Sequence, residues 1–520
     1  MRSSLHHLLE EHADARGDDP ALTYRETTLG YAELWNAVGR VAAGLTALGV
    51  DRHDRVAVFL DKRLETVESI FGISAAGGVF VPVNPLLKPP QVAYIVDDCD
   101  VRILITTPER LELLAPALQG CSSLERVVLV GEAQPEQASA LATHTWTDLT
   151  STGSALPAQP RVDLDIAAIL YTSGSTGMPK GVVLSHRNLI VGAESVSTYL
   201  GNTSDDVILA ALPLSFDAGF SQLTTAFSVG AHVVLMNYLL PADVVRLCAR
   251  HRVTGLTCVP PLWIQIAQQT WPEDVGRRLR YFANTGGRMP KRTLVRLREL
   301  FPTARPFLMY GLTEAFRSTY LDPSEVDARP DSIGKAIPNA EILVVRPDGT
   351  PCDPGEEGEL VHRGPLVALG YWNDPERTAE RFRPAPGQHA PWRAPELAVW
   401  SGDTVVTDED GFLYFVGRAD EMIKTSGYRV SPTEVEEAAY ATGLVRDAVA
   451  LGIDDAELGQ RIALVVTSAA EQLSADDVIV ALRRDLPLYM VPATVDVRDE
   501  IPRSPNGKFD RALVREDLRE

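Results

Sequence analysis

The stretch Ile166 to Gly181, IAAILYTSGSTGMPKG, decides the fold class and the first functional hypothesis. Its first part, Ile166 to Tyr171, is a short apolar run that indicates a buried strand. The part that follows concentrates hydroxyl side chains, glycines and one lysine, Lys180, within ten residues. Glycines let backbone amides approach an anion closely, and a lysine adds a cation. The stretch therefore predicts a loop that binds a polyphosphate.

The P-loop of kinases and ATPases is the nearest alternative for this loop. That motif ends in Gly-Lys-Ser or Gly-Lys-Thr, whereas Lys180 lies between Pro179 and Gly181. The Walker motif is therefore excluded. A flexible Ser/Gly turn with a solvated lysine is the other alternative, and the density of donors directly after a buried strand disfavours it.

Around this loop, short β-branched runs alternate with segments of helical length. The predicted strands are Arg55 to Leu60, Val79 to Val83, Val101 to Thr106, Arg126 to Val130, Ile166 to Tyr171, His232 to Met236 and Thr257 to Pro260. Such alternation is typical of parallel sheets covered on both faces. We therefore predict the α/β class, with a large N-terminal body of parallel or mixed sheets flanked by helices. Glu132 to Pro160, rich in Ala, Gln, Ser, Thr and Pro, is predicted to be a surface linker.

The pattern of predicted secondary structure changes twice toward the C-terminus. From about residue 341 to 416, short strands and Gly/Pro turns predict a small β-rich subdomain within an N-terminal domain of residues 1–416. A boundary near residues 417–420 separates it from a C-terminal domain, residues 417–520. Two helical segments and two strand-like runs there predict a compact α+β unit. We expect this unit to be mobile.

Composition limits the class of partner. The 520 residues carry 49 Lys and Arg against 70 Asp and Glu, a formal net charge of −21, with 45% hydrophobic residues. These are globular values, and the acidic balance disfavours nucleic acid and anionic membrane surfaces. The five cysteines are scattered without metal-binding spacing, and the N-terminal segment lacks the apolar run of a signal peptide. We expect a cytoplasmic protein with a small-molecule substrate, no nucleic acid and no membrane insertion.

Further segments from Tyr171 to Lys508 resemble, in order, those of the AMP-forming adenylating superfamily. That family includes acyl-CoA synthetases, peptide-synthetase adenylation domains and firefly luciferase. The resemblance implies that a carboxylate is joined to the α-phosphate of ATP with Mg²⁺ present, that pyrophosphate leaves, and that the acyl group passes to a thiol. It implies ATP contacts from the glycine-rich loop, namely from Thr172, Ser173, Gly174, Ser175, Thr176, Gly177 and Lys180.

The segment Tyr310-Gly311-Leu312-Thr313-Glu314 resembles the second nucleotide segment of the family. The resemblance implies that Tyr310 stacks on adenine, that Thr313 hydrogen-bonds the α-phosphate, and that Glu314 binds Mg²⁺. Taken alone, a buried tyrosine and a helix-capping Thr-Glu pair would be the simpler interpretation. The order of the matching segments favours the nucleotide site.

Three more segments resemble parts of the nucleotide site and its moving domain. Gly286 and Gly287 follow a predicted strand and permit a close backbone approach to the adenine. Asp403, in Ser-Gly-Asp, corresponds to the carboxylate that accepts both ribose hydroxyls. In the segment from Gly417 to Arg429, the resemblance implies that Arg418 contacts ribose and phosphate and that Asp420 is the hinge of the C-terminal domain.

Lys508 ends the segment Pro502 to Lys508, which resembles the catalytic lysine loop of the family. The resemblance implies that Lys508 bridges the substrate carboxylate and the α-phosphate during adenylation. It implies that this lysine then swings away as the domain turns. A solvated lysine after Asn-Gly is the ordinary alternative.

The acyl pocket is predicted from Phe216, Asp217, Gly311 and Phe316. An aspartate at position 217 resembles the amino-acid-activating members, in which a carboxylate pairs with the substrate ammonium. A buried carboxylate needs a cation, so Asp217 favours an amino acid, unless it is a surface residue or caps a helix at Ala218. Phe316 and Arg317, just after the Tyr310 to Glu314 segment, are both expected near the distal pocket, and Phe316 suggests an apolar group on the substrate.

The sequence leaves the acceptor open. It most resembles stand-alone amino-acid adenylation enzymes, a β-amino acid being favoured, with transfer to the phosphopantetheine of a separate carrier protein. The alternative is an AMP-forming ligase that makes a coenzyme A thioester from a non-amino acid. A non-catalytic nucleotide-binding regulator would be expected to lack Lys508 or Glu314, and the chain has both.

Overall fold

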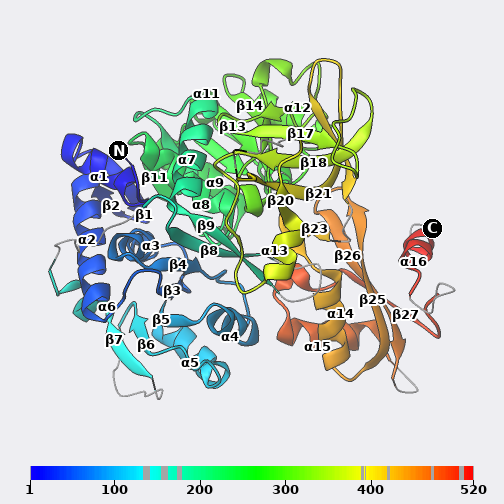
Figure 1. The fold of residues 1–520 in the computed structure, drawn as a ribbon, viewed down its shortest axis with the longest axis horizontal. Coiled ribbons are helices and arrows are strands. Elements are labelled where there is room, and N and C mark those ends of the chain that lie inside the picture. Colours follow the sequence, from blue (N-terminus) through cyan, green and yellow to red (C-terminus); the bar gives the residue numbers. More distant parts are fainter. Residues whose placement is uncertain are drawn as a thin grey trace.

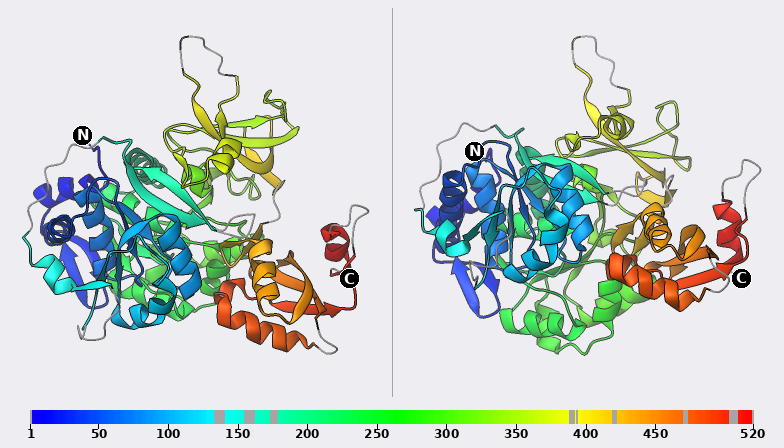
Figure 2. Two further views of the ribbon diagram at one scale, coloured as in Figure 1. Left: turned by 60° about the horizontal axis from the view of Figure 1, so that its bottom comes forward. Right: turned by 90° about the horizontal axis from the view of Figure 1, so that it is seen from below.

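The computed structural model describes residues 2–132, 141–153, 162–172, 179–387, 392, 394–418, 422–469, 473–502 and 509–518. For Arg418 and Ala512 it describes the backbone alone. Two large sheets form the body, a smaller sheet projects from it, and a fourth sheet lies beside it (Figures 1 and 2). None of the described helices is long and apolar enough to cross a membrane.

The first large sheet contains the strand that opens the glycine-rich loop. Its strand order is β19-β9-β8-β4-β3-β5-β6-β7, and the strands from β8 to β7 are mutually parallel, whereas β9 and β19 run antiparallel to their neighbours. The strands are β3 (Arg55–Val58), β4 (Val79–Pro82), β5 (Val101–Thr106), β6 (Arg126–Leu129), β7 (Ala142–Thr145), β8 (Ile166–Thr172), β9 (Lys180–Ser185) and β19 (Gly370–Tyr371). The helices between them are α3 (Leu64–Ala76), α4 (Pro89–Asp98), α5 (Pro108–Leu118) and α6 (Trp146–Thr150).

The second large sheet has the order β16-β15-β14-β13-β12-β10-β11-β1-β2. Its strands are β1 (Pro20–Tyr24), β2 (Thr27–Gly30), β10 (Val207–Ala210), β11 (His232–Leu235), β12 (Gly255–Cys258), β13 (Tyr281–Asn284), β14 (Arg305–Tyr310), β15 (Thr319–Leu321) and β16 (Lys335–Ala336). Its helices are α1 (His7–Ala15), α2 (Tyr31–Ala47), α7 (His186–Leu200), α8 (Asp217–Ser228), α9 (Pro241–His251), α10 (Pro260–Ala267), α11 (Glu273–Arg278) and α12 (Lys291–Leu300). The short 3-10 turns η1 (Thr313–Ala315) and η2 (Pro323–Glu325) follow β14 and β15.

The projecting sheet has the order β17-β18-β21-β20, with β22 paired to β21. It is built from β17 (Glu341–Val345), β18 (Glu357–Arg363), β20 (Phe382–Pro384), β21 (Leu397–Thr407) and β22 (Leu413–Arg418), and helix α13 (Pro375–Arg381) accompanies it. All its pairs are antiparallel. These strands lie where the sequence predicts a β-rich subdomain.

The last sheet, with the order β24-β23-β26-β25 and β27 paired to β26, belongs to the C-terminal segment. Its strands are β23 (Ile423–Thr425), β24 (Tyr428–Val430), β25 (Val445–Asp455), β26 (Gly459–Ser468) and β27 (Thr494–Arg498), and its helices are α14 (Pro432–Ala441), α15 (Ala475–Asp485), η3 (Leu488–Met490) and α16 (Arg511–Asp517). We call the unit from β23 to α16 the lid. It lies against the body with α14 and α15 facing the body in Figure 1.

The predicted α/β class is confirmed, with parallel and mixed sheets flanked by helices. The predicted linker from Glu132 to Pro160 is wrong in part, because Ala142–Thr145 forms β7 and Trp146–Thr150 forms α6. The run Ala-Thr-His-Thr carries two β-branched residues and pairs with the open edge of β6. Residues 133–140 and 154–161 lie outside the described part of the chain.

Candidate functional site

The glycine-rich loop joins two antiparallel strands. Strand β8 ends at Thr172 and β9 begins at Lys180, and these two residues are cross-strand partners. The predicted ATP contacts Ser173, Gly174, Ser175, Thr176 and Gly177 lie outside the described residues. Because β8 is buried over its central residues, Thr172 and Lys180 mark the point where the chain leaves the sheet at the carboxyl end of β8. Ligands of open α/β sheets bind at this end of the strands.

Lys180 and Glu314 form a buried ion pair. The Nζ atom of Lys180 donates to Glu314 Oε1 at 3.0 Å and to the hydroxyl of Tyr371 at 2.6 Å. The Tyr371 hydroxyl donates in turn to Glu314 Oε1 at 2.7 Å. The side chains of Lys180 and Glu314 are 10% and 1% exposed. The pairing of β19 with β9 brings Tyr371 to this pair.

The charge around Glu314 keeps its carboxylate ionised. Burial alone would raise the pKa of Glu314, but the nearby cations Lys180, Arg429 and Arg381 outweigh it and hold that pKa well below its usual range. Burial lowers the pKa of Lys180, and the attraction of Glu314 opposes that change. Arg429 comes from the lid and Arg381 from the end of α13. Three units of the chain thus supply cations to one buried carboxylate.

The described residues fit a magnesium ion that arrives with a nucleotide. They contain no group of three or more His, Cys, Asp or Glu side chains that could hold a metal by themselves. Mg²⁺ keeps several waters and is commonly bound by one or two carboxylates plus substrate phosphates. Glu314 would supply one such oxygen ligand.

Tyr310 and Asp403 meet at the junction of the second large sheet and the projecting sheet. The Tyr310 hydroxyl donates to Asp403 Oδ2 at 2.5 Å, and both residues are buried. Asp403 on β21 is the cross-strand partner of Arg418 on β22, so the backbones of two predicted ribose-site residues are adjacent. The side chain of Arg418 and the predicted hinge Asp420 lie outside what the structure describes.

Gly286 and Gly287 follow β13 in a turn that the lid approaches. The Asn284 side chain donates to the carbonyl of Gly287 at 2.8 Å. Gly286 has φ +76°, and a Cβ atom there would lie 3.1 Å from Val259 and 3.9 Å from the carbonyl oxygen of Gly427. Gly427 belongs to the turn between β23 and β24. The lid therefore inserts this turn beside Gly286.

Asp217 is the first residue of α8, and Phe216 precedes it in extended backbone. Burial raises the pKa of the Asp217 carboxyl, while the Arg317 guanidinium and the amide of Ala218 oppose that rise. Asp217 thus lies at the start of a helix, where an amide and a cation both favour its ionised form. That cation belongs to the chain itself.

Arg317 lines a cavity of about 330 Å³, part of it open to solvent. Arg317 is 2% exposed, and its Nη1 donates to Thr285 Oγ1 at 2.5 Å. Its Nε finds no hydrogen-bond partner among the described residues. The other lining residues come from α7, α8 and strands β10, β12, β13 and β14 of the second large sheet, and are Val196, Leu200, Ile208, Ala218, Ser221, Gln222, Thr225, Thr257, Tyr281 and Met309.

Phe316 takes a different place from the one the sequence suggests. It is fully buried with φ +58°, and its ring packs on α7, where a Cβ at Gly192 would lie 2.5 Å from the ring. The left-handed backbone turns Phe316 toward α7 and Arg317 toward the cavity. Gly311 leaves room for this backbone path, because a Cβ atom at residue 311 would lie only 3.0 Å from the Cα of Arg317.

Lys62 is a buried residue that the sequence analysis missed. Its Nζ donates to the carbonyl oxygens of Ala210, Ala211 and Leu212 at 2.9, 2.8 and 3.0 Å. Burial lowers the pKa of Lys62 to about 7. The three carbonyls lie on the chain that leads from β10 to Asp217. The position of Lys62 in the sequence could have indicated it, because Lys62 follows the carboxyl end of a predicted strand, where ligands of α/β sheets bind.

A second cavity, of about 520 Å³ including open space, lies between body and lid. Thr172 Oγ1, Ser215 Oγ and Glu434 Oε2 are buried in its wall without a hydrogen-bond partner in the described part of the chain. Its lining residues are Pro82, Asn84, Leu87, Gln91, Ile95, Tyr171, Thr172, Pro179, Ser215, Phe216, Tyr428, Arg429, Glu434, Tyr489 and Met490. Buried polar atoms without partners are rare in proteins, so these three atoms give the wall of the cavity a polar character.

Comparison with known sequences identifies the family. A sequence model of the AMP-binding enzyme matches residues 9–372, and one of the AMP-binding enzyme C-terminal domain matches residues 434–508. The chain belongs to the AMP-binding enzyme family. The family resemblance stated from the motifs is thereby confirmed.

This AMP-binding enzyme has relatives of two kinds. It is 31% identical to tyrocidine synthase 3 of Brevibacillus parabrevis over 99% of its own length, but it spans only 8% of that protein. It is 32% identical to feruloyl-CoA synthase of Amycolatopsis sp over 95% of both chains. The o-succinylbenzoate CoA synthetase of Bacillus subtilis, bound with a product analogue, matches with a TM-score of 0.83 at 25% identity over 99% of this chain and 98% of that chain.

Proposed function

We propose that this enzyme joins a carboxylic acid to AMP at the expense of ATP and passes the acyl group to the thiol of a phosphopantetheine arm. A carboxylate oxygen attacks the α-phosphorus, and the bond to the β-phosphate oxygen breaks so that pyrophosphate leaves. The thiol sulfur then attacks the acyl carbon, AMP leaves, and the thiol proton goes to solvent. The buried Lys180–Glu314 pair at the end of the glycine-rich loop carries this proposal.

The site residues would divide the work between nucleotide and metal. Thr172, Lys180 and Thr313 would contact the phosphates, and Glu314 would bind Mg²⁺ through its ionised carboxylate. A bound Mg²⁺ would offset negative charge on the transferring phosphate. Lys180 is held by Glu314 and Tyr371, so its ammonium is oriented before a nucleotide arrives.

The remaining predicted residues would bind the rest of the nucleotide and the reacting groups. Tyr310 and Asp403 would hold adenine and ribose, helped by the backbone at Gly286 and Gly287. Lys508, which lies outside the described residues, would bridge the two reacting anions in the first step.

We propose an amino acid as the substrate, a β-amino acid being favoured. Asp217 supports this, because burial raises the pKa of its carboxyl, and a substrate ammonium would relieve the cost of ionising it. The acceptor would be the phosphopantetheine of a separate carrier protein. The cavity between lid and body supports such an arm, since its three unpartnered polar atoms could bind amide groups.

One observation favours a second candidate, a coenzyme A ligase for a non-amino acid. Arg317 already supplies a cation to Asp217, so a substrate ammonium is not required. Arg317 Nε is free to donate among the described residues, which suits a substrate carrying a hydroxyl, carbonyl or second carboxylate.

ATP–pyrophosphate exchange with α-amino, β-amino, fatty and aryl acids tests the proposal. We expect the best exchange with an amino acid and a loss of about 100-fold in Asp217→Ala, as expected when a buried charge loses its partner. The matched control is Asp205→Ala, which removes an exposed carboxylate. Best exchange with fatty or aryl acids, unaffected by Asp217→Ala, would establish the second candidate instead.

A further inference from the structure

Helix α14 of the lid meets helix α4 of the body through two polar side chains. The Nε2 atom of Gln91 donates to Glu434 Oε1 at 3.1 Å. Gln91 Oε1 accepts from the backbone of Lys88 at 3.1 Å, so the amide group of Gln91 is oriented with its NH₂ toward the lid. The amide of Glu434 donates to Ser431 Oγ, which caps α14. Each partner is therefore placed by the first turn of its own helix.

Glu434 is held in surroundings that favour its neutral form. Burial raises the pKa of Glu434 to about 7, the hydrogen bond from Gln91 opposes this rise, and Glu437 on the same helix adds to it. From the other elements, Tyr489 of η3 and Arg429 of β24 line the same cavity, and Tyr428 stacks on Tyr489 with ring centroids 3.8 Å apart.

The orientation of the lid bears on which step this contact serves. One face of the lid sheet packs on α14 and α15, and the opposite face packs on Ile501 and on Val514 of α16. Figure 1 shows α16 on the side of the lid away from the body, while α14 faces the body. Ile501 and Phe509, which flank the predicted catalytic-lysine loop, thus belong to the outer face.

The hairpin of β23 and β24, which reaches the site in this orientation, carries Gly427 in its turn and Arg429 in β24. For Lys508 to reach the phosphates, the lid would have to turn its outer face toward the body. Such a rotation would carry α14 away from α4 and break the contact between Gln91 and Glu434.

We propose that Gln91 and Glu434 form a latch that holds the lid in the orientation used for thiol transfer. The two are positioning residues for the second half-reaction, and the first half-reaction does not use them. This inference rests on the proposed function, in which one lid serves two steps in turn. A buried hydrogen bond of this kind changes the balance of two orientations by about three- to tenfold.

The latch weakens as the pH rises. In the latched orientation the Glu434 carboxyl keeps its proton up to a pKa of about 7, against 4.5 for an ordinary glutamate. The latched orientation therefore binds more protons between these values, and its relative stability falls as the pH rises from about 4.5 to about 7. Above that range the contribution is constant. Glu434→Gln keeps an acceptor for Gln91 and removes the titration.

Separate assays of the two half-reactions on the full chain test the latch. Pyrophosphate exchange reports the first step, and transfer from preformed acyl-AMP to pantetheine in a single turnover reports the second. We expect Gln91→Ala and Glu434→Ala each to slow the second step about three- to tenfold while exchange stays unchanged. The double variant should be no slower than the singles. Asp476→Ala, an exposed change on α15 of the lid, is the control and should alter neither step.

An equal loss in both steps, or the same loss in Asp476→Ala, would overturn the latch. In Glu434→Gln, the ratio of the transfer rate to the pyrophosphate-exchange rate should be the same at pH 8 as at pH 6. A fall of this ratio between pH 6 and pH 8 in that variant would also contradict the latch.

Hydrogen–deuterium exchange keeps the test independent of activity. Gln91→Ala and Glu434→Ala should each speed amide hydrogen exchange at the starts of both α4 and α14 without lowering Tm. Unchanged amide exchange at these two helix starts overturns the latch. If no acid supports pyrophosphate exchange, the proposed function is wrong. The amide hydrogen exchange of α4 and α14 still shows in that case whether Gln91 and Glu434 hold the lid on the body.

Discussion

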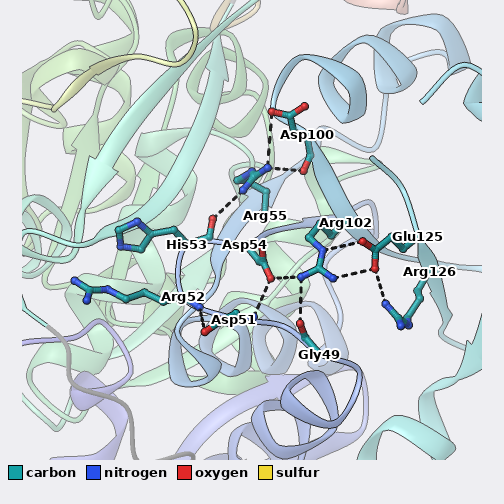
Figure 3. A network of polar contacts seen from close by, with 10 residues as sticks. All are labelled: Gly49, Asp51, Arg52, His53, Asp54, Arg55, Asp100, Arg102, Glu125 and Arg126. Carbon is teal, nitrogen blue, oxygen red and sulfur yellow. Dashed lines mark hydrogen bonds and ion pairs between the residues drawn. The ribbon is translucent and has the colours of Figure 1, made fainter. Parts of the chain in front are cut away.

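The two edges of the first large sheet use charge in opposite ways. At the amino ends of β3, β5 and β6, Arg102 pairs with Asp54 and bonds both carboxylate oxygens of Glu125 at 3.1 and 2.9 Å (Figure 3). Arg126 donates to the same Glu125. These side chains are partly exposed and each has a partner within the chain.

At the carboxyl edge of the same sheet, polar groups are buried and incompletely paired. Lys180 and Glu314 are almost fully enclosed, and Thr172 Oγ1 has no partner among the described residues. Exposed ion pairs contribute little to stability, whereas buried polar atoms without partners are costly. The contrast indicates that the charges of the amino edge are paired within the chain, whereas the carboxyl edge keeps buried polar groups where we propose that the nucleotide binds.

The largest effect should come from Glu314→Gln. Replacing the carboxylate removes the proposed Mg²⁺ ligand and leaves Lys180 without its ion pair, so pyrophosphate exchange should fall about 100-fold or more. The matched control at the other edge is Glu125→Gln, which should leave exchange within about twofold, as is usual for surface changes. Equal losses in both variants would show that the two edges do not differ in role.

A smaller and more selective effect is expected for Arg317→Met. The variant keeps the side-chain volume and removes the donors toward the cavity, so the KM for the preferred acid should rise about tenfold while the KM for ATP stays the same. Steady-state kinetics over both substrates provide the measurement. Arg305→Met, at the exposed start of β14, is the control, and a matching rise in the KM for ATP would contradict a role confined to the acid.

Lys62→Met should act mainly on the shape of the acid pocket. Loss of three donors to the carbonyls of residues 210–212 leaves buried acceptors unpaired, and the free energy of unfolding should fall by about 1–3 kcal/mol. Urea denaturation measures this cost. In the folded variant the KM for the acid should rise more than the KM for ATP, because these carbonyls precede Asp217. Lys291→Met, an exposed change, should affect neither quantity.

The smallest effect belongs to the amino edge. Arg102→Ala should lower the free energy of unfolding by about 1 kcal/mol or less, with a difference that shrinks in high salt. Activity should be unchanged. Thermal unfolding at two salt concentrations and pyrophosphate exchange test this prediction. A marked loss of pyrophosphate exchange would show that the amino edge contributes to activity.

The sequence supported the α/β class because local patterns specify it. Buried strands read as short β-branched runs, and most predicted strands lie within a residue or two of β3, β4, β5, β6, β8, β11 and β12. The strand β7 was missed because it is short, polar and stabilised by the open edge of β6 rather than by its own pattern.

Parts of the site depend on contacts that no local pattern encodes. The hydrogen bond from Lys180 to Tyr371 joins residues 191 positions apart, through the pairing of two strand ends. Of the two residues expected near the pocket, Arg317 lines the cavity and Phe316 packs on α7. This division depends on the positive φ of Phe316, a conformation that a bulky side chain rarely adopts. The contact of Gln91 with Glu434 depends on how the lid lies on the body.

The close approach of Gly427 to Val259 sets a limit on how tightly lid and body can join. A methyl group at residue 427 would fall 2.9 Å from both methyl carbons of Val259, and the φ of +80° there already disfavours any side chain. The distance between the two units at this point is thus set by the absence of one carbon atom. An alanine would act as a spacer, and the enzyme would keep the chemistry of its first step while losing the fit on which the second depends.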